Sequence, residues 1–446
     1  PKYTQVHARV RTRGENTEMT AITERFFELH PKSAALAEQG RRLFPDGVTH
    51  DIRRADPFAM YMDRGSGPRK WDVDGNEYID YRTGHGSMIL GQADPRIVAA
   101  VSDAVAKGTH LSASSEMEIK WGELVSELVP SIEKMRFHNS GTEAVMMAFR
   151  MARSFTGKDK IVRFQDAFHG WADGPYVGTD TDLGDNGIPQ GTRDSVIIVE
   201  YDLDQVEETL KTNDDVAAVV FQGNVVMRPA FIEGLRDLTT RYGVLLIMDE
   251  VVSGFRWSLA GNQGRYNITP DLTTMAKILA GGLPGGAVGG RADVIDTIGK
   301  GKIAHPGTFN ANPLSATAGM TALQIVRDEP ILETADARAE RLKAGLNEVL
   351  TRLEVPGYAY GTASVVATKL GVDQSFDNEF GGTGQASGTP YSGAVHSVLD
   401  QGMINNGIYC FVGSFILSAT HSEQDVDRTI DAFETTLKQA REEGTI

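Results

Sequence analysis

Short apolar runs alternate with longer helical patterns from about residue 134 onward, and this alternation is the strongest constraint on the fold. Five runs carry it: 134–138, 160–164, 196–199, 217–221 and 244–248. Such a rhythm is typical of crossover units, which place strands in a mostly parallel sheet with helices on both faces. Ligands of such sheets bind at the carboxyl ends of the strands. The sequence therefore predicts an α/β protein with its chemistry at that edge.

The two ends of the chain predict a second, smaller domain. Residues 70–81 read as two strands joined by an Asp-Gly-Asn turn, because Asp-Gly adopts positive φ at little cost. After about residue 325 come an amphipathic helix through Leu350, strand-like runs, a Gly/Ser stretch at 381–393 that suggests a mobile loop, and a helix from Glu423 to about Arg441. We expect three parts: an N-terminal arm and part of the small domain (1–84), a large domain (85–325) and the rest of the small domain (326–446).

Composition narrows the choice of partners and compartment. The net charge of −16 repels phosphate backbones and anionic lipids, so we expect neither a nucleic-acid nor a membrane partner. With Cys410 as the single cysteine, no intrachain disulfide can form, and we expect a cytoplasmic location. The sequence has no HExxH pair and no Cys/His cluster, so it predicts no metal site.

A lysine and an aspartate each follow an apolar run. Lys277 ends one such run, just before a glycine-rich stretch at 281–290, and Asp249 stands where the run 244–248 stops. A lysine alone is usually a solvated surface charge. Together, however, the amine and the carboxylate suit pyridoxal 5'-phosphate, which needs a lysine for a Schiff base and an aspartate for its pyridinium nitrogen. Lys277 and Asp249 are therefore the predicted catalytic pair.

Residues 138–144 join the first run to a helical pattern that continues through Arg153. Free backbone N–H groups and the helix dipole make such a junction an anion site, to which the hydroxyls of Ser140 and Thr142 add donors. The alternative is a plain helix cap, since Ser or Thr followed three positions later by Glu is a common N-terminus. A nucleotide P-loop is disfavoured because no GxxxxGK[ST] run is present.

Phe168-His169-Gly170 follows the second run. An aromatic ring here can cover one face of a flat heterocycle, and Gly170 allows close backbone approach. Taken alone, Phe168 would be a core residue and His169 a structural histidine. Residues 306–313 offer a hydroxyl and side-chain amides before another helix, and alone would be a turn.

Together, the motifs at 139–144, 168–170, 249–251, 277 and 307–309 resemble, in order and spacing, the class III aminotransferases of the fold-type I pyridoxal phosphate enzymes. Residues 71–81 and 88–91 look most like the glutamate-1-semialdehyde aminomutase subgroup and its transaminase relatives. The resemblance covers about residues 43–438. It implies a large domain with a mostly parallel seven-stranded sheet and a small α/β domain made from both chain ends.

The resemblance also implies roles for individual residues. Ser140, Gly141 and Thr142 would hold the cofactor phosphate, and Thr308 would reach that phosphate from the partner subunit of a homodimer. Phe168 and Val251 would pack on the two ring faces, with His169 beside them. Asp249 would keep the ring nitrogen protonated, and Lys277 would bond the cofactor and later act as a base.

Two departures from the family pattern bear on the reaction. Gln222 stands where the family commonly has glutamate, and residues 408–415 are shorter than the aminomutase stretch and lack its glutamate. Arg53 matches an arginine of the aminomutases and is a candidate for binding a substrate carboxylate.

These features predict an aminotransferase that moves an amino group from an amine or an ω- or β-amino acid to a keto acid such as pyruvate by a ping-pong mechanism. The alternatives on the same site are a 2,1-aminomutase and an amino-acid racemase. A pyridoxal-binding protein without catalysis is a third possibility, and a Rossmann dehydrogenase is disfavoured because no GxGxxG follows a strand.

Overall fold

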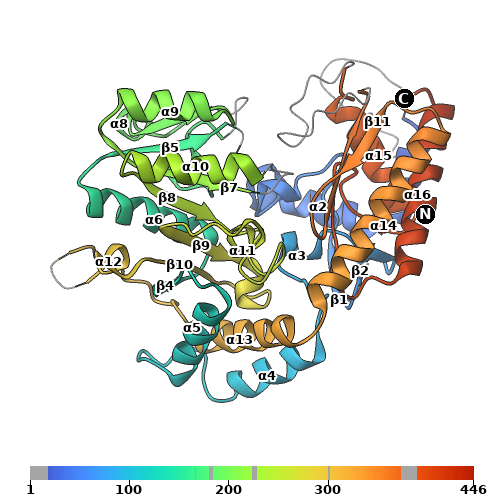
Figure 1. Ribbon diagram of the computed structural model, residues 1–446. Coiled ribbons are helices and arrows are strands. Elements are labelled where there is room, and N and C mark those ends of the chain that lie inside the picture. The colour runs from blue at the N-terminus through green and yellow to red at the C-terminus, as the bar shows by residue number, and fades with distance from the viewer. Residues whose placement is uncertain (1–18, 166, 180–183, 224–228, 300–301, 373–388) are drawn as a thin grey trace.

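The computed structural model describes residues 19–165, 167–179, 184–223, 229–299, 302–372 and 389–446. Within these residues, a seven-stranded sheet is covered by helices, and a smaller α/β half lies beside it (Figure 1). The predicted α/β architecture with a mostly parallel seven-stranded sheet is therefore confirmed. Residues 1–18, at the start of the predicted N-terminal arm, and most of the Gly/Ser stretch lie outside the described residues.

The large sheet has the order β4 (Lys134–His138), β10 (Gly286–Gly290), β9 (Leu272–Ala276), β8 (Leu245–Asp249), β7 (Val216–Gln222), β5 (Lys160–Phe164) and β6 (Val196–Val199). Strands β9, β8, β7, β5 and β6 run parallel to one another, whereas β10 is antiparallel to both of its neighbours. The fully buried strands β7 and β8 lie inside the sheet, as continuous apolar runs require.

Strand β10 lies within the glycine-rich stretch. Residues 281–290 have the composition of a loop, but Gly286–Gly290 is a buried strand of the sheet. Its glycines are needed for close approach, because a Cβ on Gly286 would collide with the Ser140 carbonyl oxygen.

The helices that accompany the large sheet are α4 (Pro95–Val105), α5 (Glu116–Leu128), α6 (Gly141–Thr156), α7 (Asp173–Tyr176), α8 (Gln190–Asp194), α9 (Leu203–Thr212), α10 (Pro229–Arg241), α11 (Asn262–Tyr266), the 3-10 turn η3 (Lys277–Ala280), α12 (Ala292–Ile295) and α13 (Pro313–Asp328). Helix α6 shows how the sequence sets such an element. Ser140 caps its first turn by accepting the Glu143 N–H at 3.2 Å, and Gly157 ends it in the left-handed region at φ 70°.

The small half combines strands from both parts of the chain. One sheet has the order β1 (Met62–Ser66), β2 (Arg69–Asp72), β3 (Glu77–Asp80) and β13 (Ile408–Tyr409); a second has the order β11 (Gly357–Tyr360), β12 (Val365–Leu370) and β14 (Ser414–Ile416). The antiparallel pair of β2 and β3 is the hairpin predicted at 70–81. Strand β3 pairs in parallel with β13, so that Ile79 lies opposite Ile408.

Helices accompany these two small sheets, and the two longest of them lie on the outside (Figure 1). They are α1 (Ala21–Leu29), α2 (Pro31–Leu43), α14 (Ile331–Arg352), α15 (Gly393–Asn405) and α16 (Glu423–Glu442), with the short turns η1 (Pro45–Gly47), η2 (Asp51–Arg53) and α3 (Thr83–Gly86). Buried side chains from α1, β3, α14 and α16 form one apolar core. The boundaries predicted at 84/85 and 325/326 stay a prediction.

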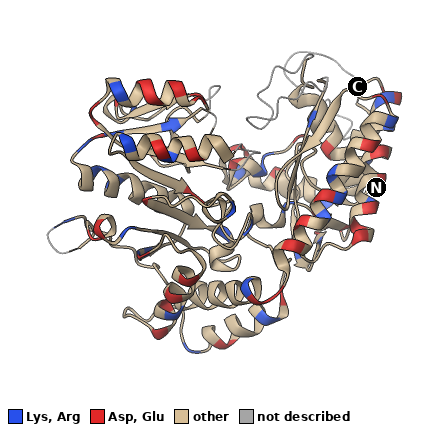
Figure 2. Cartoon of the chain, viewed as in Figure 1, with Lys and Arg blue, Asp and Glu red and all other residues tan. Residues whose placement is uncertain are grey.

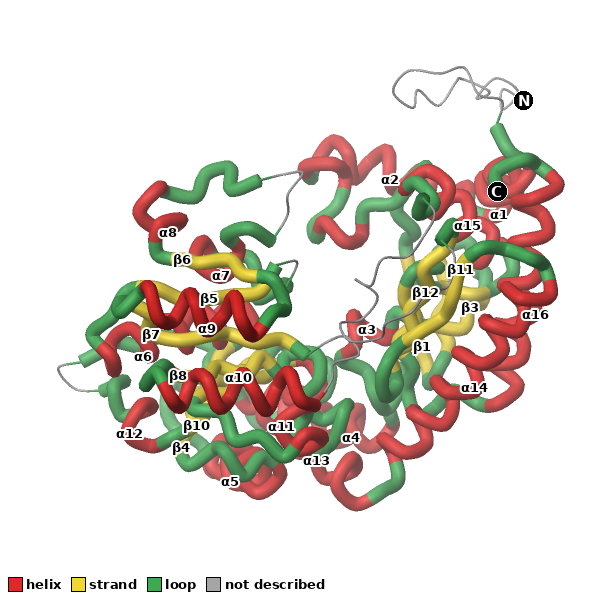
Figure 3. The backbone as a smooth tube through the Cα atoms, turned by 45° about the horizontal axis from the view of Figure 1, so that its top comes forward, coloured by secondary structure: helices red, strands yellow, loops and turns green. Residues whose placement is uncertain are grey.

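A buried arginine joins the two halves. Arg256 follows β8, and its guanidinium donates to the Ser364 hydroxyl at 2.6 Å, to the Leu417 carbonyl at 2.9 Å and to the Gly86 carbonyl at 2.9 Å. Figure 3 shows α3 between the two groups of strands. Arg256 thus fixes the α3 turn against both halves.

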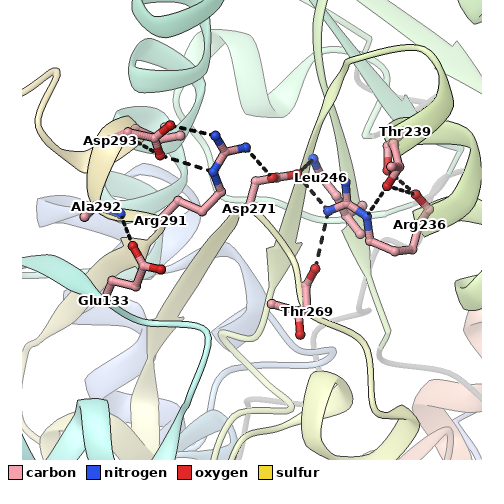
Figure 4. A network of polar contacts seen from close by, with 11 residues as sticks. Glu133, Arg236, Thr239, Leu246, Thr269, Asp271, Arg291, Ala292 and Asp293 are labelled. Atoms are coloured by element: carbon pink, nitrogen blue, oxygen red, sulfur yellow. Dashed lines mark hydrogen bonds and ion pairs between the residues drawn. The ribbon is translucent and has the colours of Figure 1, made fainter.

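At the other end of the sheet, a buried carboxylate holds together the starts of β9 and β8 and the end of β10. Asp271 precedes β9 and accepts hydrogen bonds from Arg291 at 2.9 Å, from Arg236 at 2.7 Å and from the Leu246 N–H at 2.8 Å (Figure 4). Because these partners come from the start of β8, from α10 and from the residue after β10, Asp271 fixes the strand that delivers Lys277.

Charged side chains gather on outer helices such as α9, α14 and α16, with both signs interspersed, while the large sheet is mostly uncharged (Figure 2). Of the helices in the described part of the chain, none combines the length and the apolar character that a membrane span requires.

Candidate active site

Lys277 stands at the carboxyl end of β9, where it begins η3. Its φ of 55° lies in the left-handed region, which is rare for a residue with a side chain and is often found at functional sites. Burial lowers the pKa of the Lys277 amine; the nearby Asp249 charge opposes this shift, and the Arg256 charge adds to it. The protein therefore places a lysine with a lowered pKa at the edge of the sheet where ligands bind.

Asp249 ends the neighbouring strand β8 and is 1% exposed. One carboxylate oxygen accepts the His169 Nδ1–H at 2.7 Å, and the other accepts the Val251 N–H at 3.0 Å and the Thr274 hydroxyl at 3.2 Å. These donors fix the orientation of the carboxylate. The structure thus brings together His169, Asp249 and Val251, and adds Thr274, which the sequence reasoning missed because a threonine inside a strand carries no distinguishing signal.

The predicted phosphate site lies at the start of α6. Ser140 does cap the helix, as the alternative interpretation holds, but its hydroxyl accepts in that bond and keeps its own hydrogen for a ligand. A Cβ on Gly141 would lie 2.9 Å from Val251 Cγ1, and one on Gly170 would lie 2.6 Å from Thr142 Oγ1. The three predicted segments therefore meet at one helix N-terminus, where the first backbone N–H groups have no partner within the helix.

Phe168 lies beside this site with 53% of its surface exposed. Its N–H donates to Gln222 Oε1 at 3.1 Å, and Gln222 lies opposite Asp249 in the pairing of β7 with β8. A large aromatic side chain left open next to a buried carboxylate is typical of a binding site for an apolar or flat ligand.

Two predicted residues lie apart from this group. Thr308 is exposed, and its carbonyl accepts a hydrogen bond from His110 Nε2. The same segment touches the phosphate site through Asn310, whose amide oxygen accepts from Asn139 at 3.0 Å. Arg53 is exposed in η2 and donates to the Thr49 hydroxyl at 3.0 Å.

The sequence reasoning missed the α3 turn. Thr83, Gly84, His85 and Gly86 all have positive φ, at 40°, 60°, 55° and 89°. Each non-glycine residue held there costs about 1–3 kcal/mol, so the surrounding structure must impose the turn. The Gly-His-Gly triplet is the signal that could have indicated it.

The α3 turn places one histidine beside another. The His85 ring stacks on that of His50, with 5.2 Å between the ring centres. Burial lowers the pKa of His85 to about 4, helped by the positive charges of Arg82 and Lys277. His85 is therefore neutral at physiological pH.

A cavity of about 280 Å³ lies in the small half, beside this turn. Its lining includes Phe58, His396, Asp400, Tyr409 and Phe411. Burial raises the pKa of Asp400 to about 7. Neither Lys277 nor Asp249 lines this cavity, so it is a neighbour of the candidate site and not its centre.

A half-buried amine and a buried carboxylate at the ends of adjacent parallel strands, beside a helix N-terminus, are the donor set of the fold-type I pyridoxal phosphate enzymes. The Aminotransferase class-III family model matches residues 52–437, and the chain belongs to this family. Its cofactor is pyridoxal 5'-phosphate, which the exposed ring of Phe168 and the open cradle at α6 fit.

Three relatives show the range of activities within the family. The chain is 37% identical over 428 residues to glutamate-1-semialdehyde 2,1-aminomutase 2 of Brevibacillus brevis, an alignment that covers 92% of this chain and 99% of the relative. An omega-transaminase from Sphaerobacter thermophilus superposes with a TM-score of 0.84 at 34% identity, covering 92% of this chain and 98% of the other. A transaminase with PLP bound superposes with a TM-score of 0.83 at 28% identity, covering 93% and 99%.

Proposed function

We propose that this protein is an aminotransferase that moves an amino group from an amine or an ω- or β-amino acid to a keto acid such as pyruvate by a ping-pong cycle. The observation that carries the proposal is the placement of Lys277 and Asp249 at the ends of the adjacent strands β9 and β8. When bound, pyridoxal phosphate supplies an aldehyde that bonds amines and a protonated ring that accepts electrons released at the substrate carbon.

Lys277 has two tasks in this proposal. Its lowered pKa increases the fraction of unprotonated amine, and only that form attacks an aldehyde. With a substrate in the site, the Lys277 amine would move a proton at the substrate carbon as a general base.

The remaining residues of the proposed site hold and orient the cofactor and the substrate. Asp249 carries the negative charge that keeps the ring nitrogen protonated, and His169 holds that carboxylate in place. The other proposed contacts are Ser140, Gly141 and Thr142 with the phosphate, Phe168 and Val251 with the ring faces, Thr308 of the partner subunit with the phosphate, and Arg53 and Gln222 with the substrate.

Covalent attachment of the cofactor tests the role of Lys277 without any turnover. We expect the purified protein to be yellow and borohydride to fix the cofactor on the Lys277 peptide, detected by mass spectrometry. Lys277→Ala should lose both the fixed adduct and turnover. Lys134→Ala is the matched control, because Lys134 is an exposed lysine of β4 that pairs with Asp296 on the surface. Retention of the adduct in Lys277→Ala would refute the assignment.

The half-reactions test the reaction type. A panel of amines should convert the enzyme to its aminated form, with one carbonyl product released per site, and pyruvate should then reverse the change. Gln222 favours this outcome, because the family's carboxylate at that position is replaced by an uncharged side chain that accepts the Phe168 N–H.

The second candidate is a glutamate-1-semialdehyde-type 2,1-aminomutase, and the 37% identity to the enzyme of Brevibacillus brevis favours it. An aminomutase holds its intermediate through both half-reactions, so no free keto product should accumulate. Efficient isomerisation of glutamate-1-semialdehyde, with no turnover of any external amine and keto acid pair, would establish this candidate and exclude the transaminase. A racemase, the third alternative, would instead invert a chiral amino acid without a keto acid.

A further inference from the structure

Arg82 presents a half-buried guanidinium that the proposed chemistry does not use. Its Cζ lies 3.2 Å from the centre of the Phe411 ring, and its Nη2 donates to His85 Nδ1 at 3.3 Å. His85 thus accepts through Nδ1, and the ring that it stacks upon belongs to His50. An aromatic face and a neutral imidazole orient the guanidinium but do not neutralise its charge.

The carboxylates nearest to Arg82 have other partners. Asp80 pairs with the Lys70 amine at 2.9 Å and accepts an amide N–H from Gln92 at 3.0 Å. Asp400 accepts the Val412 N–H at 2.6 Å, and burial raises its pKa. Over the described ranges, no carboxylate forms an ion pair with Arg82, which leaves a partly desolvated cation without an anion.

The backbone after Arg82 leads to Lys277. Asp80 Oδ1 accepts the N–H groups of Arg82 at 3.0 Å and of Thr83 at 3.2 Å, and the left-handed turn follows immediately. The turn ends at Gly86, where an added Cβ would lie 3.8 Å from Lys277 Cδ. Arg82 therefore begins a turn whose last residue lies against the Lys277 side chain, and His85 within that turn is close enough to be affected by the positive charges of both residues.

We propose that Arg82 binds the carboxylate of the amino-group donor, with His85 and Phe411 holding the guanidinium for a two-hydrogen-bond contact. The inference rests on the proposed function and deepens it: the donor is an amino acid, and an amine without a carboxylate is the poorer substrate. Arg82 acts in addition to Arg53, which is exposed and whose guanidinium donates to the Thr49 hydroxyl.

Chemical modification tests the subsite independently of turnover. Phenylglyoxal reacts with accessible guanidinium groups, and peptide mass spectrometry of the treated holoenzyme follows Arg82 alone. Propanoate should slow the modification of Arg82 several-fold, whereas the uncharged propanamide should not. Equal effects of the two compounds, no effect of either, or an Arg82 that never reacts would each overturn the inference.

Kinetics of two matched donors test what the subsite does. The pair is 3-amino-3-phenylpropanoate and 1-phenylpropylamine, which differ at a carboxylate. Arg82→Met should raise KM for the amino acid roughly 10- to 100-fold, as the loss of a charge-assisted hydrogen bond implies, while kcat changes little and the simple amine is unaffected. Arg82→Lys should recover part of the loss. Arg64→Met is the matched control. Arg64 lies on β1, and its guanidinium also covers an aromatic ring, that of Trp71, at 3.7 Å.

The two arms separate the inference from the function that it assumes. If neither donor turns over in the wild-type enzyme, the panel of amines decides the proposed function and the modification experiment alone decides the role of Arg82. If both donors turn over and Arg82→Met slows them equally, Arg82 has only a structural role.

Discussion

At the scale of single residues, the site depends on charges that are held by specific partners. Asp249 shows this most directly, because each of its two oxygens receives at least one hydrogen bond from a neighbouring element. A carboxylate fixed in this way does not need to reorganise when charge develops beside it, which is how preorganised groups stabilise a transition state.

Replacing Asp249 by asparagine keeps the shape and removes the charge. We expect Asp249→Asn to bind the cofactor but to lose rate on the order of a thousandfold, as the loss of one preorganised electrostatic contact implies. Steady-state kinetics and cofactor absorbance check the two parts. Asp296→Asn, on an exposed carboxylate that pairs with Lys134, is the control. A near-normal rate in Asp249→Asn would remove the ring-nitrogen role.

His421 couples stability to pH. Its ring is buried, stacks on Tyr81 at 4.7 Å and accepts the Ser418 N–H through Nδ1 at 3.0 Å, and burial lowers its pKa to about 4. A histidine with a lowered folded-state pKa contributes stability above its unfolded value near 6.5, and that stability is lost as the pH falls from there toward 4.

Urea denaturation at pH 7 and pH 5 measures this coupling. Between pH 7 and pH 5, His421 should lower the free energy of unfolding by about 2 kcal/mol. The reason is that its imidazole binds a proton in the unfolded chain but stays unprotonated in the folded one. His421→Gln should therefore lose less stability than the wild type over the same interval. Parallel losses in the two proteins would contradict the assignment.

The α3 turn marks the limit of sequence reasoning at this scale. Asp249 could be predicted because it ends a recognisable apolar run, and Lys277 because it follows Met275-Ala276 and precedes a glycine-rich stretch. Arg82 and His85 could not, since their conformation depends on Asp80, Arg256 and Lys277, which lie on other elements.

At the scale of elements, the five apolar runs are confirmed as β4 to β8 to within a residue. Strands β9 and β10 could not be predicted in the same way. Two threonines interrupt the apolar pattern of β9, and β10 is mostly glycine, so packing and not propensity makes it a strand.

Close packing by glycine also holds the turn that carries Lys277. On α13, a Cβ at Gly319 would collide with the Leu279 carbonyl oxygen and lie 2.7 Å from Trp121 Nε1. The Trp121 N–H donates to that same carbonyl at 3.2 Å. Helix α13 therefore contacts η3 without room for a methyl group.

Gly319→Ala should destabilise the protein by about 1–3 kcal/mol, because overpacking forces α13, Trp121 or η3 to shift. Thermal unfolding measures the loss, and the absorbance of bound cofactor reports any displacement of Lys277. Gly191→Ala on α8 is the matched control, since a Cβ there meets nothing within 4 Å. An unchanged Tm in Gly319→Ala would show that η3 can shift to make room for the methyl group at no cost in stability.

At the scale of the whole molecule, the surface around Thr308 indicates an interface. Phe309 is 58% exposed and lies edge-on to His110 at 5.7 Å, and Leu111 next to His110 is also exposed. Exposed large apolar side chains that gather in one place are typical of surfaces covered in an assembly. We therefore propose a homodimer in which Thr308 reaches the site of the partner subunit.

Mixed dimers test this sharing of residues. Lys277→Ala and Thr308→Asp should each be inactive, the second because a carboxylate repels the cofactor phosphate. After subunit exchange, about a quarter of wild-type activity should return, because half of the dimers are hybrids that each contain one unmutated site. Mass spectrometry verifies the exchange. No recovery despite exchange would place Thr308 in the site of its own chain.

The pairing of β3 with β13 has a consequence for synthesis on the ribosome. Ile79 finds its partner Ile408 only after several hundred further residues have been made, which takes on the order of tens of seconds. The large sheet is complete once Gly290 has emerged, so it can fold while β1–β3 still have an open edge. An open edge is a template for wrong pairing with another chain. The nascent hairpin is therefore the segment for which protection by a chaperone matters most.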